Sequence, residues 1–524
     1  MYVTRPLSRY LANPTAAAEA PPEGPGSGFL VVVDEAAVEQ ARTCYWGLCR
    51  DREVRSLPFP QSLQLSLKED DTPHPAETAI LCVSETFFGV SGSTGRPPVT
   101  APDYAVFVPV VGEPLSSRRY YVVRARGKHT GKVSACSRLE DKTTCCCFCS
   151  ITKDVPPRSF DRGDVYQQVE EQQLAPGRNG FRAVAVAGDG IPPNYLRKKK
   201  GWKVEGMASP VYDLADDAQG VDVALRARMP PDLDGAAGVL GRWYVPFLFV
   251  KADGDRRLKD QFRRCTFYKM TLEQSWEQIY SHEGTVLPGR EPPEEVTVTA
   301  TVRRFTVLLG GTDAVRPQAD GGVMWFPPQA AGTTAAGVGV VGLDMVVWER
   351  MKWEVDRGGW VAAAGNGRHE GDELERIERV ERRDGGGGLG QWRKFGCYLL
   401  VERFELRRTD GSVALTCEFR FTNKIRARWV LLMSKGSSFH ILPRWVATTT
   451  AVFSSPVMTS LMICFDGFLP RFQELVTVLQ LETNFSVSMC VFLYCLLSQS
   501  ATFSACISYS ISYMHRHKVV ANPN

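Results

Sequence analysis

The sequence predicts an α+β fold that is predominantly β, with two β-rich domains, a few helices and Gly-rich loop insertions. Many short segments are rich in Val, Tyr and Phe and alternate apolar with polar residues, as half-buried strands do. Few segments place apolar residues at helical spacing. A chain of 524 residues is also too long for one ordinary core, which favours more than one domain.

The first half of the chain contains most of the short strand patterns. Residues 12–28 are a run of Ala, Pro and Gly, so we predict that residues 1–28 form a flexible N-terminal arm. A strand at 29–33 and a short helix at 34–42 follow, and further strands are predicted at 79–88, 104–111, 119–125 and 181–187. A boundary within 192–206 divides a domain of residues 29–195 from a second domain of residues 196–429.

The second half mixes predicted helices with longer strands. Helices are predicted at 212–229, at 270–280 and at 370–383, where the apolar residues recur at helical spacing. Strands are predicted at 243–251 and 296–309. The clearest hairpin spans 401–421 around Thr409, Asp410, Gly411 and Ser412. Gly-rich stretches at 310–342 and 385–390 are expected to be surface loops.

The composition changes abruptly after Trp429, and only eight of the residues beyond it are charged. Residues 484–514 are uncharged and are followed by His515, Arg516, His517 and Lys518, as a membrane anchor would be. The many Ser, Thr and Cys residues weaken that interpretation. Residues 430–524 are therefore expected to be either an artefact of the gene model or an anchor, with the artefact preferred.

Clustered cysteines are the best candidate for chemistry. Cys146 and Cys149 form a CxxC pair, Cys136 lies upstream, and His129 could complete a tetrahedral set of zinc ligands. Buried structural thiols, lipid acylation and a redox switch are the alternatives. The spacing of the residues does not decide between them, so zinc is the one candidate cofactor, and no catalytic residue or other cofactor is recognised.

Basic residues suggest little about the partner. The formal net charge is +4, which is too small to indicate nucleic acid. Residues 197–203 (RKKKGWK) are the sharpest basic run, with Trp202 as an aromatic that could stack on a ligand. Residues 127–132 (GKHTGK) resemble a phosphate-binding loop but have the wrong spacing, so a tight turn is the better interpretation.

Several spaced motifs resemble one family. They are MYVTRPLSRY, CYWGLCRDREVRSLPFPQ, YYVVRARGKHTGK, CCCFC, DVYQQVE, IPPNYLRKKKGWKVE, WYVPFLFVK, FYKMTLEQSWEQIY, VWERMKWE and FGCYLLVERFELRRTDGS. Together they are similar to the uncharacterised plant proteins that carry the domain of unknown function 1262, over about residues 1–429. The resemblance implies an intracellular protein, in a group often linked with stress response. It implies no catalytic residue, because the family defines none.

These observations predict an intracellular, cytoplasmic protein that is not an enzyme and that binds a protein partner or a small ligand rather than nucleic acid. A zinc or redox protein centred on residues 136–149 is the first alternative. A tail-anchored membrane protein is the second, and it applies only if residues 484–514 are genuine.

Overall fold

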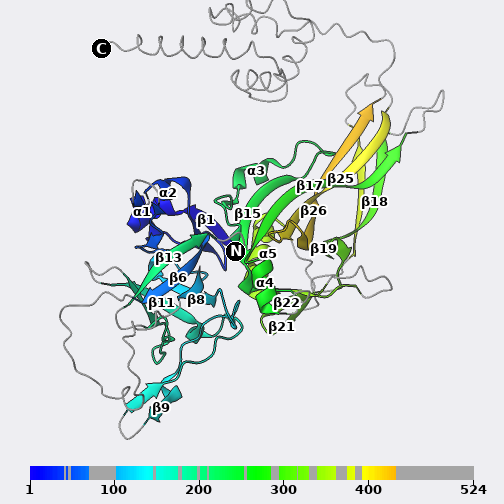
Figure 1. Ribbon diagram of the computed structural model, residues 1–524. Helices are drawn as coiled ribbons and strands as arrows, with labels where there is room; N and C mark the ends of the chain where they lie inside the picture. Colours follow the sequence, from blue (N-terminus) through cyan, green and yellow to red (C-terminus); the bar gives the residue numbers. More distant parts are fainter. Residues whose placement is uncertain are drawn as a thin grey trace, which may run out of the picture. The chain divides into compact units, whose positions relative to one another are not determined.

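The computed structural model is predominantly β, which confirms the predicted fold class (Figure 1). It describes residues 1–431 except 41–42, 45–48, 70–101, 146–148, 175–179, 198–200, 209–211, 253–256, 285–293, 316, 330–338, 361–373 and 384–391. Met1–Met433 form one compact unit. The second unit, Ser434–Asn524, lies outside the described residues, and so do the predicted tail segment 484–514 and the predicted strand at 79–88.

The larger of two main sheets has nine strands. Its order is β2 (Gly28–Val32), β1 (Tyr2–Pro6), β15 (Gly238–Pro246), β17 (Phe267–Glu283), β25 (Trp392–Arg407), β26 (Val413–Leu431), β19 (Phe305–Leu309) and β20 (Thr312–Asp313), with β14 (Gly220–Val221) pairing β15. The predicted hairpin at 401–421 is confirmed as the end of β25, a turn and the start of β26, with Phe404 opposite Cys417.

The smaller main sheet has seven strands. Its order is β12 (Phe181–Ala185), β11 (Gln168–Gln173), β8 (Arg119–Arg124), β7 (Asp103–Pro109), β6 (Leu63–Glu69), β13 (Trp202–Ala208) and β5 (Glu53–Val54). Because β13 pairs with β6 along its whole length, the residues just after 195 continue this sheet. The division into two domains at residue 195 stays a prediction.

Shorter sheets and helices complete the described part of the chain. A four-stranded sheet contains β16 (Val250–Ala252), β23 (Val341–Asp344), β22 (Val323–Phe326) and β21 (Gln318–Asp320). Three strand pairs are β18 (Glu295–Arg303) with β24 (Leu374–Arg382), β9 (Lys142–Cys145) with β10 (Cys149–Thr152), and β3 (Thr43–Cys44) with β4 (Cys49–Arg50). The α-helices are α1 (Leu7–Ala12), α2 (Glu35–Gln40), α3 (Val223–Arg228), α4 (Leu258–Arg264) and α5 (Met345–Arg357). None of the helices within the described ranges is long and apolar enough to cross a membrane.

Both faces of the seven-stranded sheet are covered. Strand β8 alternates between two cores, because Tyr121 and Val123 pack with residues of the nine-stranded sheet, whereas Tyr120 and Val122 face a second, aromatic core. That second core is built around Phe59, Phe107, Phe181 and Trp202, with ring centroids 4.8–6.0 Å apart.

The N-terminal residues differ from the predicted flexible arm. Residues 2–6 form β1, which lies between β2 and β15, and Tyr2 is fully buried. The Tyr2 hydroxyl donates a hydrogen bond of 2.7 Å to the Pro109 carbonyl oxygen. The apolar residues that precede the Ala/Pro/Gly run thus pair in a sheet and are buried in the core. The composition of residues 12–28 gives no information about these first residues.

Two of the predicted helices are strands. Residues 270–280 belong to β17, where Tyr268, Met270, Leu272 and Trp276 are buried in strict alternation. Residues 374–382 form β24, which pairs with β18 in full register and leaves Leu374 and Val380 exposed. Glu, Gln and Arg favour helices in isolation, but pairing overrides that preference: β17 pairs with β15 and β25, and β24 pairs with β18. The predicted helix at 212–229 is reduced to α3.

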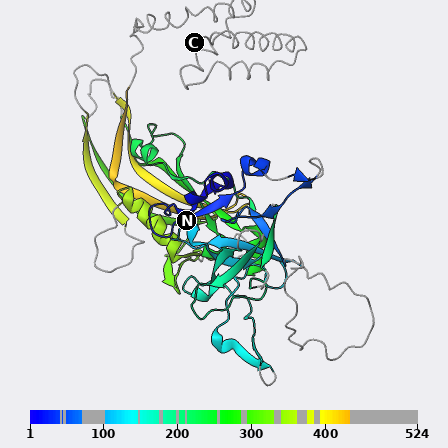
Figure 2. The ribbon, with the colours of Figure 1, turned by 90° about the vertical axis from the view of Figure 1, so that its left-hand side faces the viewer.

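The long strands extend beyond the two main sheets' shared core, with the β18–β24 pair beside them (Figures 1 and 2). Val296 and Val298 of β18 pack against Trp392, Phe395 and Cys397 of β25. This smaller core supports the ends of β17, β25 and β26, where polar side chains gather on the opposite face.

Candidate functional site

The structure does not place the predicted zinc ligands together among the residues that it describes. Cys136 is buried in the aromatic core, and its backbone N–H donates to the Tyr166 carbonyl oxygen at 2.7 Å. His129 lies half-buried in the turn after β8, and Cys149 begins β10 opposite Cys145. Cys146 and the Cys149 side chain lie outside the described residues. No group of three or more potential metal ligands is present among the residues that the structure describes, and the zinc site stays a prediction.

Burial makes Cys136 a poor nucleophile. It raises the pKa of the Cys136 thiol to about 12, with smaller contributions from Asp164 and Glu171. This thiol is therefore protonated at neutral pH. The thiolate is the form that reacts and binds metal, so the protonated thiol does neither readily. We expect iodoacetamide at pH 8 to leave Cys136 unmodified in the folded protein and to modify it after unfolding in urea, as measured by peptide mass spectrometry. Rapid modification of the folded protein would contradict the buried position.

The turn after β8 is the most distinctive surface feature. We call residues 124–132 the basic turn. Its ends are closed by hydrogen bonds from the Gly131 N–H to the Arg124 oxygen at 2.8 Å and from the Arg124 N–H to the Lys132 oxygen at 2.9 Å. Gly131 has φ +82°, and a Cβ there would lie 2.9 Å from the Leu258 oxygen of α4. The predicted tight turn is confirmed, and α4 fixes its position.

Two arginines of the basic turn stack on tyrosines. The Arg124 guanidinium lies 4.3 Å from the Tyr195 ring centre and pairs with Asp103 at 2.6 Å. The Arg126 guanidinium lies 3.8 Å from the Tyr104 ring centre. The Tyr195 hydroxyl is 2.5 Å from the Ser134 hydroxyl, which anchors that ring. Stacking restricts both guanidinium groups. Arg124 is engaged by Asp103, whereas within the described ranges Arg126 makes only a long hydrogen bond of 3.4 Å to the Gln64 side-chain oxygen.

Apart from Arg124, the cations of the basic turn have no acidic partner among the described residues. Arg126, Lys128 and Lys132 form no ion pair with any residue in the described ranges, and the first two are exposed. Burial and the cations Lys128, Lys132 and Arg124 lower the pKa of His129. The local charge is therefore positive enough to disfavour a further proton. An anion bound here would relieve that repulsion.

The sequence contains a signal for the basic turn that the phosphate-binding-loop motif does not detect. Residues 114–139 contain no Asp or Glu but include Arg118, Arg119, Arg124, Arg126, Lys128, Lys132 and Arg138.

The predicted basic run at 197–203 does not offer Trp202 as a stacking surface. Trp202 is fully buried, stacks near Phe107 and donates its indole N–H to the Leu196 oxygen, so it is not available to a ligand. Residues 198–200 lie outside the described residues.

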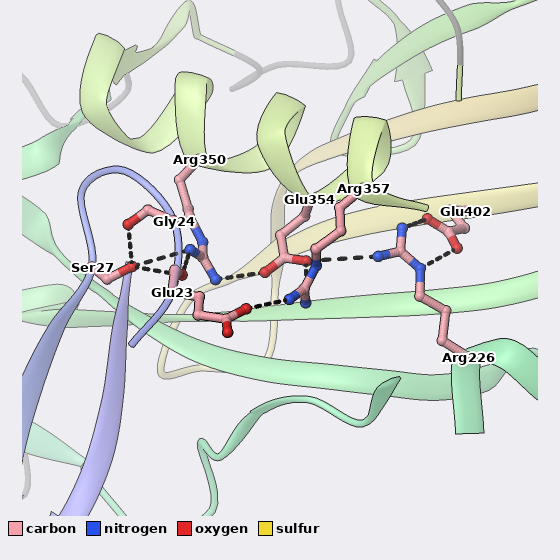
Figure 3. A network of polar contacts seen from close by, with 8 residues as sticks. All are labelled: Glu23, Gly24, Ser27, Arg226, Arg350, Glu354, Arg357 and Glu402. Atoms are coloured by element: carbon pink, nitrogen blue, oxygen red, sulfur yellow. Dashed lines mark hydrogen bonds and ion pairs between the residues drawn. The ribbon is translucent and has the colours of Figure 1, made fainter. Parts of the chain in front are cut away.

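A buried ionic network lies elsewhere, between α5, the 23–27 segment, α3 and β25 (Figure 3). Glu354 accepts hydrogen bonds from Arg350 at 2.5 Å and Arg357 at 2.9 Å, and it lies 3.6 Å from the Arg226 guanidinium. Arg226 also forms a two-pronged pair with Glu402, while Arg350 donates to the backbone carbonyl oxygen of Glu23.

The network is balanced in charge. Arg226, Arg350 and Arg357 face Glu354, Glu402 and Glu23, and both Glu354 and Glu402 are fully buried. Because Glu354 and Glu402 are both paired with arginines, neither buried carboxylate is free to act on a ligand. It instead fixes α5 to the sheet and to the N-terminal segment.

Comparisons with known proteins agree with part of the sequence interpretation. Residues 23–148 match a family model described as "Protein of unknown function (DUF1262)", which supports the resemblance to that family. The matched segment includes β8 and the basic turn. A search of curated proteins found no match. Among solved structures, the crystal structure of Cry35Ab1 is similar over 71% of this chain and 90% of that chain, with 9% identity and a TM-score of 0.36.

Proposed function

We propose that this protein, whose residues 23–148 match the DUF1262 family, is a non-enzymatic cytoplasmic binding protein that holds a phosphate-bearing ligand at its basic turn. The observation that carries the proposal is a set of cations that form no ion pair within the described ranges, on a turn held in place by α4. Arg126 offers a planar, pre-oriented fork, and Lys128 and Lys132 offer point charges. That combination suits phosphate oxygens.

Rigidity of the basic turn favours binding. Backbone hydrogen bonds and the Gly131 contact with α4 hold the turn, and the Tyr104 ring restricts Arg126. Little conformational entropy is then lost when an anion is bound. Lys259 and Arg263 of α4, the helix against which the turn packs, also form no ion pair within the described ranges and add to the positive potential.

Neutralising the basic turn should weaken binding. We expect the R126Q/K128Q/K132Q variant to bind inorganic triphosphate at least about tenfold more weakly than the unmutated protein, because each 1.4 kcal/mol of lost interaction is a factor of ten. Isothermal titration calorimetry at two salt concentrations measures this, and affinity should fall as salt rises.

A matched control separates the site from overall charge. Arg52, Arg393 and Lys394 are exposed and form no ion pair among the described residues, so R52Q/R393Q/K394Q removes the same charge elsewhere. That variant should bind like the unmutated protein. Equal weakening in both variants would show only a general charge effect. Stronger binding of duplex DNA than of triphosphate would contradict a small phosphate-bearing ligand.

A further inference from the structure

A second surface lies on the far end of the nine-stranded sheet. Residues 229–238, which we call the strap, connect α3 to β15 and cross the face formed by β17, β25 and β26. The Trp276 indole N–H donates to the Pro230 oxygen at 2.9 Å, and Arg426 donates to the same oxygen at 3.4 Å. The Tyr398 hydroxyl donates to the Asp234 carboxylate at 3.1 Å, and Arg428 also donates to that carboxylate.

The four side chains under the strap form one continuous surface. Strand register places Tyr398 directly opposite Arg426, and Arg428 opposite Gly396 on the same face. The Arg426 guanidinium stacks 4.8 Å from the Trp276 ring centre. We call Trp276, Tyr398, Arg426 and Arg428 the receptor surface. It combines two aromatic rings with two cations.

Much of the strap is exposed to solvent. Asp232 and residues 234–237 are exposed, and Met229, at its start, has a φ of +55° that non-glycine residues adopt rarely. Its contacts with the receptor surface are mainly hydrogen bonds near solvent, whose net contributions are about 0.5–1.5 kcal/mol each. Met229 and Leu233 pack against the hydrophobic core, so we expect displacement to involve the exposed residues 234–237 while the start of the strap stays in place.

Asp234 shows which chemistry the receptor surface accepts. Its carboxylate takes a hydroxyl donor and a guanidinium donor at once, yet more than half of the side chain is exposed. We propose that the receptor surface binds a carboxylate of an acidic peptide segment from a partner protein, and that Asp234 occupies the surface in competition with it.

Electrostatics agree with this geometry. Burial, and then the hydrogen bond to Asp234, raise the pKa of Tyr398. The same carboxylate raises the pKa of Arg428. Both donors are protonated at neutral pH and donate to the carboxylate that faces them.

The test uses a fluorescein-labelled hexaglutamate peptide and fluorescence anisotropy. All variants carry R126Q/K128Q/K132Q, so that the basic turn cannot contribute. We expect D234N to bind the peptide several-fold more tightly than its parent, because the internal competitor loses its charge. Adding R428Q to D234N should abolish the gain. D216N, which neutralises an exposed acid outside the strap, should leave affinity unchanged.

A local readout locates the effect. Hydrogen–deuterium exchange at residues 234–237 should rise when the peptide binds, because the exposed part of the strap is displaced. The proposal is overturned if D234N binds no more tightly than its parent, or if R428Q leaves the gain intact. Equal binding of triphosphate to D234N would also overturn it, because the surface would then select charge and not a carboxylate.

Discussion

Replacing Glu354 by Gln should lower the free energy of unfolding by about 3–5 kcal/mol, the typical cost of removing one partner from a buried ion pair. Glu354 is fully buried and faces Arg350, Arg357 and Arg226. Without its charge, the network retains three arginines but only two glutamates. The excess cation stays desolvated unless α5 moves.

Urea unfolding followed by circular dichroism measures this change, with the midpoint and slope compared between variants. Glu349 lies on the same helix and is exposed, which makes E349Q the matched control, with an expected change within about 0.5 kcal/mol. A similar loss in both variants would show that the helix, and not the network, responds to the substitution.

Replacing Glu171 by Met should stabilise the protein at neutral pH by about 1–3 kcal/mol, the cost of a buried polar group without a partner. Glu171 is fully buried in β11, opposite Ala183, and neither carboxylate oxygen has a hydrogen-bond partner in the described structure. Its neighbours in the aromatic core are apolar, so a side chain of similar size without charge suits the position better.

The stabilisation should depend on pH. Burial raises the pKa of Glu171 well above its usual value of 4.5. The folded state then holds a proton that the unfolded state releases, so stability falls as pH rises above about 4.5. The gain from E171M should be larger at pH 8 than at pH 5. The neighbouring half-buried Glu170 provides the control E170Q. A less stable E171M protein at pH 8 would indicate that Glu171 has a partner in solution.

The sequence predicted the sheets better than it predicted the helices or the site. Alternation in 296–309 and turn residues between 401 and 421 are local signals, and both regions form strands as expected. In contrast, 270–280 and 374–382 have helix-favouring composition, and only their neighbours in space make them strands. The role of β1 depends in the same way on pairing with residues 28 and 244.

Site residues were harder to predict because their meaning depends on burial and on distant partners. Cys136 and Trp202 have chemically suggestive side chains, yet both are enclosed in the aromatic core. Arg124 and Tyr195 are 71 positions apart and meet only after folding. The absence of acids between 114 and 139 was visible in the sequence, but which of the seven cations lack ion pairs was not.

The most direct test of the proposed function is the pKa of His129, measured by NMR with and without triphosphate, with H129Q identifying the signal. Burial and the cations around His129 lower its pKa in the free protein, and a bound anion favours the protonated imidazole. We predict that triphosphate raises the pKa of His129, and that R126Q/K128Q/K132Q loses this response. An unchanged pKa at saturating triphosphate would contradict binding at the basic turn.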